Sequence, residues 1–520
     1  MKELIFHRLL VPAAERNARR TAFVDVASGS QVTFAEHLER VSRLTSGLGT
    51  ALGVRRGDRV AVLAMNSLPY IELWHAALLG GAVMNPLNLR LSDEELTFVL
   101  ADSGSRVCCV DAAFAERVDR VRARAGIETV VLCGGGDVPH DVALDDIVAA
   151  GTADLPPEPQ EDDVCVLMYT GGTTGAPKGV VLEQRAEILN QYHFAMAVPW
   201  ERDWPFLIQT PLFHGASMLG IMGAPAFGVT TVVVPSFDPV ACMETVERHG
   251  VGFTVMVPTM INMVLSHPDF TPARLAPLRR LVYGASPIPT ALLERLAAAL
   301  PELEIIQGYG MTEGSTLVTL LTGEDHRRGG PLLTSCGRAL PGVEVTIRDA
   351  AGAPLTRGEV GEVCIRGGNF LREYWNRAEE TASAVRDGWY HSGDVGHLDA
   401  DGYLFLVDRA KDMIVTGGEN VYSAEVENAI ASHPDVLQVA VIGIPDDRWG
   451  EAVHAVVVPR PGTEPTADGI IAHVRVTVAG YKVPKSVSFR TEPLPLSAAM
   501  KVLKRELRAP FWEGRARAIN

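Results

Sequence analysis

The chain has 520 residues, too many for a single hydrophobic core, so about two to four structural units are expected. Apolar residues make up 47% and charged residues 21% of the chain, which is ordinary for a soluble globular enzyme. The formal net charge of −16 argues against a nucleic acid or an anionic membrane bound by general electrostatics.

The cysteines and the first residues indicate the compartment. The seven cysteines are scattered without a CxxC pair, which suits reduced thiols and not a disulfide framework or a zinc site. The opening residues 1–20 carry an apolar stretch too short and interrupted for a signal peptide. No uninterrupted apolar run reaches the roughly 20 residues of a membrane helix. We therefore expect a soluble, cytoplasmic protein.

The first 400 or so residues alternate helical patterns with short β-rich runs, as an α/β fold requires. Residues 34–52 have apolar side chains near helical spacing, and residues 57–65 begin with a Gly-Asp turn and continue as a buried strand. Residues 70–88 repeat the helix-to-strand pattern, and residues 105–112 form another short buried strand. From about Leu332 the chain is β-rich, with short strands between glycine-rich turns.

After Asp408 the pattern changes again. Residues 423–433 and 466–480 predict helices, and residues 436–444 and 452–459 predict strands. About 110 residues with their own α+β alternation are enough for a separate small domain. We therefore predict an N-terminal domain over residues 1–408 and a mobile C-terminal domain over residues 409–520.

The most informative segment is YTGGTTGAPKGV, residues 169–180, which directly follows a strand-like run. Its four glycines let the backbone approach a ligand and point N–H groups at it. It is not a Walker A loop, because Pro177 and not glycine precedes the lysine. Anionic oxygens would suit the hydroxyls and the cation of the loop, which are Thr170, Thr173, Thr174 and Lys178. Alone, the segment could equally be a flexible turn.

Four further motifs accompany this loop. They are QGYGMTEG (307–314), GWYHSGDVG (388–396), DRAKDMIVTGGENVYSAEVE (408–427) and PLSAAMKVLKRELR (495–508). In this order and at these separations, the five segments resemble the adenylate-forming superfamily, which includes acyl-CoA synthetases, beetle luciferases and the adenylation domains of peptide synthetases. The resemblance spans nearly the whole chain.

The resemblance implies a fold and an activity. The fold would be α/β, with a large N-terminal domain of two stacked α/β subdomains plus a β-rich subdomain, and a small mobile α+β C-terminal domain. The activity would be that of an AMP-forming acyl-CoA synthetase. It would convert a carboxylic acid, ATP and coenzyme A (CoA) to acyl-CoA, AMP and pyrophosphate through an acyl-adenylate, with Mg²⁺ as cofactor.

The resemblance also implies roles for residues that bind the nucleotide. Tyr309 would stack on adenine, and Asp394 would accept hydrogen bonds from the ribose hydroxyls with Arg409 nearby. Departing pyrophosphate would be held by Thr173, Thr174 and Lys178, and the nucleotide site would also include Thr170, Gly172 and Gly310. Without the motifs, Tyr309 would be an ordinary aromatic residue and Asp394 a turn residue.

Three residues would act on the reacting groups. Glu313 would hold Mg²⁺ through a hard oxygen ligand, and Thr312 would touch the α-phosphate. Lys501 would bridge the substrate carboxylate and the phosphate, although a lone lysine is usually a solvated surface charge. The small domain would then turn about Lys411, so that the loop containing Gly418 lines the pantetheine tunnel for the second step.

The acid would lie among three segments, PLFHG, GASP and QGYGM, which contribute His214, Gly284, Ala285, Gly308 and Met311. His214 is either a substrate contact or a satisfied buried imidazole. No other charge appears in these segments, and Gly308 is small. An apolar tail is therefore expected, from a medium- or long-chain fatty acid or from an aryl-propenoic or steroid-like acid, and acetate is not favoured.

The chain departs from the family pattern at several positions. Gly171 replaces a usual serine, and Glu183-Gln184 replaces a usual Thr-His pair. Met500 stands where relatives have glycine before the lysine. Because methionine adopts positive φ only at a cost, we expect this loop to follow a different path, with Lys504 as the alternative catalytic lysine.

Other functions remain open from the sequence. The chain could load its acyl-adenylate onto a carrier protein, or it could be a catalytically dead ATP-binding homologue. Luciferase-type oxidation is more remote, and the missing Walker A sequence argues against a P-loop NTPase. The expected partners are small molecules and not nucleic acid, and the oligomeric state, a homodimer included, is undecided.

Overall fold

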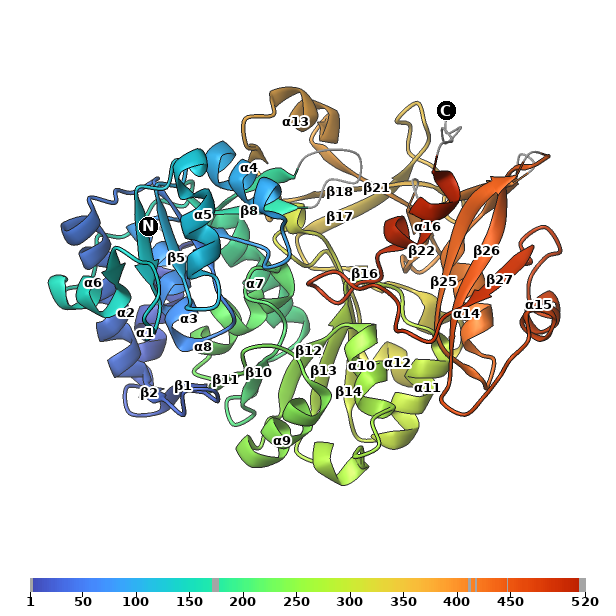
Figure 1. Cartoon of the computed structure of the whole chain (residues 1–520), viewed down its shortest axis with the longest axis horizontal. Helices are drawn as coiled ribbons and strands as arrows, with labels where there is room; N and C mark the ends of the chain where they lie inside the picture. The colour runs from blue at the N-terminus through green and yellow to red at the C-terminus, as the bar shows by residue number, and fades with distance from the viewer. Residues whose placement is uncertain (1–2, 171–176, 410–412, 417–418, 447, 514–520) are drawn as a thin grey trace.

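The computed structural model describes residues 3–170, 177–409, 413–416, 419–446 and 448–513. It confirms the predicted fold class. Two large sheets are flanked by helices, and a curled β-sheet and a small C-terminal α+β unit accompany them (Figure 1). Among the described residues, none of the helices is both long and apolar enough to cross a membrane.

The first sheet has nine strands in the order β16-β15-β14-β13-β12-β10-β11-β1-β2. Its central strands are parallel, and antiparallel pairs flank them at both edges. Because parallel strands end at the same edge, the carboxyl ends of the central strands form a natural ligand site. The strands are β1 (Thr21–Asp25), β2 (Gln31–Thr33), β10 (Phe206–Ile208), β11 (Thr231–Val233), β12 (Phe253–Met256), β13 (Arg280–Gly284), β14 (Glu304–Tyr309), β15 (Thr319–Leu321) and β16 (Arg338–Ala339).

The second sheet has eight strands in the order β19-β9-β8-β4-β3-β5-β6-β7. The predicted runs 57–65 and 105–112 contain β3 and β5, which pair in parallel and are almost wholly buried. The strands are β3 (Arg59–Leu63), β4 (Val83–Pro86), β5 (Val107–Val110), β6 (Thr129–Leu132), β7 (Val142–Ala143), β8 (Val164–Thr170), β9 (Lys178–Glu183) and β19 (Glu373–Tyr374).

Helices cover and separate these two sheets. The helix predicted over 34–52 is α2, which begins with a capping box between Thr33 and Glu36 and ends at Gly53, whose φ is +66°. The helices of this part are α1 (His7–Arg16), α2 (Phe34–Leu52), α3 (Leu68–Ala76), α4 (Asp93–Ser103), α5 (Ala115–Ala125), α6 (Leu144–Ala150), α7 (Gln184–Ala197), α8 (Ala224–Ala226), α9 (Pro239–His249), α10 (Pro258–Leu265), α11 (Thr290–Ala299) and α12 (Gly323–Arg328).

The curled sheet joins the large sheets to the C-terminal unit. Its order is β17-β18-β21-β20, with β22 paired to β21, and helix α13 (Ala378–Ala384) precedes β20. The strands are β17 (Val343–Arg348), β18 (Gly361–Gly367), β20 (Val385–Arg386), β21 (Trp389–Leu398) and β22 (Leu404–Arg409). The long strand β21 carries most of the GWYHSGDVG motif into the site.

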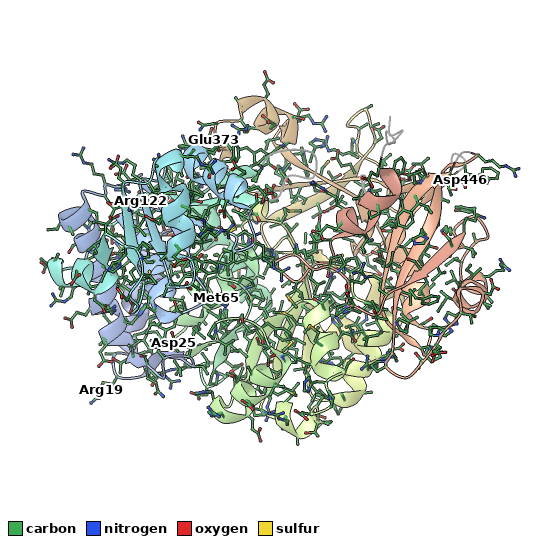
Figure 2. The ribbon with its side chains drawn as sticks, viewed as in Figure 1. Arg19, Asp25, Met65, Arg122, Glu373 and Asp446 are labelled. Atoms are coloured by element: carbon green, nitrogen blue, oxygen red, sulfur yellow. The ribbon has the colours of Figure 1, made fainter. Side chains whose placement is uncertain are left out.

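The C-terminal unit has its own sheet, β24-β23-β26-β25 with β27 beside β26, and its own core around Ile414, Val441 and Ile470. The helix predicted over 466–480 is shorter, because α15 ends at Arg475. Figure 2 shows Asp446 at the end of β25, far from Met65 and Arg122 of the second sheet region. The elements are β23 (Ile414–Thr416), β24 (Glu419–Val421), α14 (Ser423–Ala431), β25 (Val436–Asp446), β26 (Gly450–Pro459), α15 (Ala467–Arg475), β27 (Ser486–Phe489) and α16 (Lys504–Trp512).

Candidate active site

Tyr309 and Asp394 meet at the carboxyl edge of the first sheet. Tyr309 ends β14, and its hydroxyl donates a 2.7 Å hydrogen bond to Oδ2 of Asp394 on β21. Burial and the Asp394 carboxylate raise the pKa of Tyr309 well above its usual range, so the phenol stays a neutral donor. Arg409 lies opposite Asp394 in the β21–β22 pair, and its side chain lies outside the described part of the chain.

Glycines around Tyr309 are required by close backbone packing. A Cβ atom at Gly310 would lie 1.9 Å from the carbonyl oxygen of Thr316. One at Gly284 would lie 2.2 Å from the carbonyl oxygen of Gly308, its partner across β13 and β14. A Cβ at Gly308 would come within 2.7 Å of Leu317. Because glycine has no side chain, β13, β14 and the turn after β14 can pack backbone against backbone at these positions.

Thr312 and Glu313 lie in a short 3₁₀ turn, Thr312–Gly314, directly after the edge of the sheet. Oε1 of Glu313 accepts a 2.8 Å hydrogen bond from the hydroxyl of Tyr374 on β19. The ammonium nitrogen of Lys178 lies 5.4 Å from the centroid of the same tyrosine ring. Tyr374 therefore connects the lysine of the phosphate loop with the predicted metal ligand.

The ends of the phosphate loop are placed by a hairpin. Thr170 ends β8 and faces Lys178, which begins β9, in the antiparallel pair. The predicted residues Gly172, Thr173 and Thr174 lie outside the described residues, as do Lys411 and Gly418.

His214 lies in the PLFHG segment, where its Nδ1 accepts a 3.2 Å hydrogen bond from the backbone N–H of Ala216. Burial, together with the nearby ammonium of Lys501, lowers the pKa of His214 to about 3, so the imidazole is neutral. Ala285 adopts a positive φ of 70° at the end of β13, and Met311 packs against the main core. The structure thus brings Lys501 of the C-terminal unit to the predicted acid region.

The lysine loop corrects an expectation from the sequence. Met500 adopts φ +60°, the left-handed conformation that we expected a methionine to avoid. Two features stabilise this turn: Met500 packs against a core cluster of the first sheet, and the hydroxyl of Thr259 donates a 2.6 Å hydrogen bond to its carbonyl oxygen. The Ser497 N–H donates to the carbonyl of Lys501 at 2.7 Å and closes the loop.

Other contacts hold the C-terminal unit against the large sheets. Arg90 donates to the carbonyl of Leu496, and the N–H of Thr290 donates a 3.0 Å hydrogen bond to Oδ1 of Asn428. The alternative lysine, Lys504, instead lies 2.7 Å from Glu427 within the small domain. The geometry therefore favours Lys501 over Lys504 as the lysine directed to the site.

Two family models match the chain. The model described as AMP-binding enzyme matches residues 10–375, and the model described as AMP-binding enzyme C-terminal domain matches residues 425–501. The chain belongs to the AMP-binding enzyme family. The predicted membership of the adenylate-forming superfamily is therefore confirmed.

Several relatives of this AMP-binding enzyme are named as CoA synthases or CoA ligases. A feruloyl-CoA synthase of Amycolatopsis sp is 41% identical, over 93% of this chain and 94% of its own length. The long-chain-fatty-acid–CoA ligase FadD13 of Mycobacterium tuberculosis is 36% identical, over 97% of this chain and 98% of its own. ATP-bound MatB from Rhodopseudomonas palustris has a TM-score of 0.88 at 27% identity, with 99% of both chains covered. The predicted class, an AMP-forming acid–thiol ligase, is confirmed.

Sequence reasoning missed three residues of this AMP-binding enzyme. Tyr374 follows no motif, and only the β19–β9 pairing brings it to Glu313. Tyr390 belongs to a recognised motif, and its hydroxyl lies 3.3 Å from that of Tyr374. Glu187 lies on α7 and is 2% exposed. Glu187 shares a face of α7 with Asn190 and Gln191, and only the structure shows that this face is buried.

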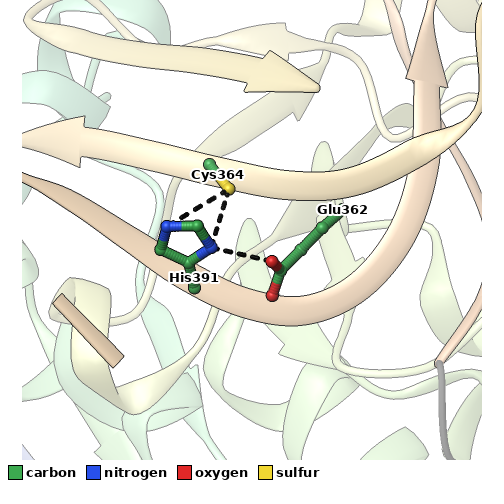
Figure 3. Close-up of side chains that lie close together, drawn as sticks. All are labelled: Glu362, Cys364 and His391. Atoms are coloured by element: carbon green, nitrogen blue, oxygen red, sulfur yellow. Dashed lines mark hydrogen bonds and ion pairs between the residues drawn. The ribbon is translucent and has the colours of Figure 1, made fainter. Parts of the chain in front are cut away.

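A cluster of Glu362, Cys364 and His391 lies on β18 and β21 (Figure 3). Nδ1 of His391 is 2.7 Å from Oε2 of Glu362 and 3.3 Å from Sγ of Cys364. Nη2 of Arg386 lies 2.7 Å from the same Nδ1, so a cation here would meet a guanidinium. The hydrogen bonds of this cluster hold the strand that carries Asp394.

Proposed function

We propose that this enzyme activates a carboxylic acid with an apolar or aromatic tail as its acyl-adenylate and transfers the acyl group to CoA. The observation that supports this best is the position of Lys501. Its ammonium helps to lower the pKa of the half-buried His214 imidazole, and the carbonyl of the preceding residue, Met500, accepts a 2.6 Å hydrogen bond from Thr259, so a C-terminal lysine lies near the predicted acid region. Such an arrangement suits the first half-reaction, in which a cation must face both the carboxylate and the phosphate.

The nucleotide would be bound between the first sheet and the curled sheet. Tyr309 would present its ring to adenine, and Asp394 would accept hydrogen bonds from the ribose hydroxyls, with Arg409 beside it. Lys178 and the hydroxyls of the phosphate loop would hold the pyrophosphate, and Thr312 would contact the α-phosphate. The buried Tyr309–Asp394 hydrogen bond supports this assignment because it fixes both groups before ATP arrives.

Glu313 fits a magnesium ligand. Its carboxylate is a hard oxygen donor, and the hydroxyl of Tyr374 orients it at 2.8 Å. Mg²⁺ bound there would neutralise phosphate charge. The substrate carboxylate would attack the α-phosphorus in line and pyrophosphate would leave, while Lys501 and the loop donors stabilise the charge that builds on the phosphoryl oxygens.

The second half-reaction needs the thiol of CoA at the carbonyl of the acyl-adenylate, and a lysine that faces that carboxyl group in the first step would have to leave before the thiol approaches. We infer that residues 409–520 form a domain that turns about Lys411 and presents the loop of Gly418 to pantetheine. The contacts through Arg90, Thr290 and Thr259 would break in that rotation.

The names of the relatives narrow the range of carboxylic acids that this enzyme would accept. Those named for feruloyl-CoA and for long-chain fatty acids both handle tails that are largely apolar. The three predicted acid-binding segments also favour an apolar tail. Their one side chain that could carry a charge near neutral pH is His214, whose lowered pKa keeps it neutral. An aryl-propenoic acid or a medium- to long-chain fatty acid is therefore our proposed substrate class.

A panel of acids tests the function. The purified enzyme with ATP and Mg²⁺ should release pyrophosphate only with an accepted acid, and CoA should accelerate release and yield AMP and a thioester. A relative from Streptomyces coeruleorubidus, 36% identical over 95% of this chain, is named a fatty acid–[acyl-carrier-protein] ligase. Turnover that a carrier protein accelerates and CoA does not would favour that second function. ATP binding without release for any acid would contradict both.

A further inference from the structure

Glu187 is a carboxyl group in the protein interior next to the candidate site. It lies in the first turn of α7, which directly follows β9 and its Lys178, and the residue is 2% exposed. Its Oε2 atom is fully buried and has no hydrogen-bond partner in the described part of the chain. An unpaired buried carboxyl lowers the stability of a fold, so its presence calls for a functional explanation.

The group that faces Glu187 is the hydroxyl of Ser315. Ser315 directly follows the Thr312–Gly314 turn, and it adopts φ +51°, while the next residue, Thr316, adopts φ +99°. Two consecutive residues with positive φ that are not glycine indicate backbone strain, which is commonly stored at functional sites. The strained pair sets the direction in which the chain leaves Thr312 and Glu313.

Neighbouring groups hold the rest of this segment. Nδ2 of Asn190, one turn along α7, donates a 2.7 Å hydrogen bond to the carbonyl of Leu317. Nδ2 of Asn369 donates at 2.8 Å to the carbonyl of Gly314, and the hydroxyl of Thr316 donates at 3.0 Å to the carbonyl of Gly215. The hydroxyl of Ser315 is buried and, among the described residues, makes no hydrogen bond of normal geometry.

We propose that Glu187 is a positioning residue for adenylate formation, whose carboxyl closes a hydrogen bond with Ser315 and so holds Thr312 and Glu313 against the α-phosphate. This inference rests on the proposed function. It also connects two parts of the nucleotide site, because α7 continues from the hairpin of the phosphate loop. A hydrogen bond from the Glu187 carboxyl would thus fix the turn that carries Glu313 relative to that hairpin.

The ionisation of the carboxyl agrees with this role. Burial raises the pKa of Glu187 to about 8, with a smaller opposing effect of Ser315, so the group is mostly neutral at pH 7 and can donate a hydrogen bond. Because the folded-state pKa lies above the unfolded value, stability falls as the pH rises from the unfolded pKa to about 8. Glu187→Gln should therefore melt at a higher temperature than the wild type at pH 8, which a residue kept for stability would not do.

The test compares Glu187→Leu, Glu187→Gln and Ser315→Ala in the full-length enzyme. Acid-dependent pyrophosphate release reports the first half-reaction, and thioester formation from a synthetic acyl-adenylate and CoA reports the second. We expect Glu187→Leu and Ser315→Ala to lower kcat of pyrophosphate release about 10- to 100-fold, with thioester formation unchanged. Glu187→Gln, which can still donate, should stay within about 3-fold of the wild type.

A matched control is Glu72→Gln. Glu72 is also a buried helical carboxyl, 1% exposed, but it pairs with Arg40 at 2.8 Å away from the site. It should leave kcat of pyrophosphate release unchanged. Glu187→Leu with a wild-type kcat, or with equal losses in both half-reactions, would overturn the inference, and so would full additivity of Glu187→Leu and Ser315→Ala. Failure of the wild type itself to release pyrophosphate would instead overturn the proposed function.

Discussion

The hydroxyl of Tyr309 donates a hydrogen bond of 2.7 Å to the carboxylate of Asp394, and both residues are buried. Tyr309 belongs to the first sheet and Asp394 to the curled sheet, so this bond connects the two sheets. In the proposed site it orders the adenine and ribose contacts before the nucleotide binds, which reduces the entropy lost on binding.

Tyr309→Phe removes this bond and keeps the ring. Hydrogen bonds to charged groups contribute about 1.5–3 kcal/mol, so we expect KM for ATP to rise roughly 10-fold or more, with little change in KM for the acid. Steady-state pyrophosphate release measures both constants. Tyr403→Phe is the control, because it removes a 2.6 Å Tyr–Asp bond to Asp325 elsewhere. Equal effects of the two substitutions would contradict the assignment.

Tyr374→Phe removes the donor that orients Glu313. If Glu313 binds Mg²⁺, a ligand left without this partner should bind the ion about 10-fold more weakly. The concentration of Mg²⁺ for half-maximal pyrophosphate release should rise by that factor, while a large excess of Mg²⁺ restores most of the rate. An unchanged Mg²⁺ dependence would argue that Glu313 is not a ligand.

Lys501→Ala removes the cation that lies near His214. We expect adenylation to slow by about 100-fold or more and thioester formation from a supplied acyl-adenylate to continue. Lys504→Ala is the matched comparison, because Lys504 lies 2.7 Å from Glu427 within the small domain. It should lower thermal stability with a small effect on adenylation kcat. The opposite pattern would make Lys504 the catalytic lysine.

Met500→Gly tests the left-handed turn before the lysine. Glycine relieves a strain of about 1–2 kcal/mol at φ +60°, but it also removes the packing of Met500 against the first sheet. We expect adenylation kcat to stay within about 3-fold, since both residues support the same turn. Met500→Val should reduce it strongly, because β-branched residues rarely adopt this conformation. Equal activity of both variants would show that the turn does not matter.

The buried pair His37 and His75 predicts sensitivity to acid. Nε2 of His37 lies 2.7 Å from Nδ1 of His75, whose Nε2 lies 2.7 Å from the carbonyl of Ile221. Burial lowers the pKa of His75 to about 4 and that of His37 also falls well below its usual value. The unfolded chain therefore binds more protons, so stability present above about pH 6.5 is lost as the pH falls toward 4.

For His75 alone this loss amounts to about 2 kcal/mol at pH 5 relative to pH 7. Thermal melting at the two pH values measures it. The His75→Gln variant should lose less stability over this range, because its amide can still donate to Ile221 without titrating. Equal pH dependence in both proteins would mean that other groups control acid unfolding.

The sequence by itself determined the family and the fold class, and it predicted the residues of a nucleotide site. The helical spacing of apolar residues predicted α2, and short continuous apolar runs predicted β3 and β5 as buried strands. The family resemblance carried by the motifs predicted roles for Tyr309, Glu313 and Asp394, because motifs are local stretches of sequence. Lys501 was likewise predicted, through its spacing within a motif.

Only the tertiary structure decided how these parts meet. It placed Tyr374 against Glu313 through a strand pair far along the chain, and it buried Glu187 beside Ser315, two contacts with no local signal. It also showed Met500 in a left-handed turn, against the prediction, because packing and a bond from Thr259 outweigh the local preference of methionine. Local sequence encodes propensity, whereas pairing, burial and the stabilisation of strain depend on residues distant in the chain.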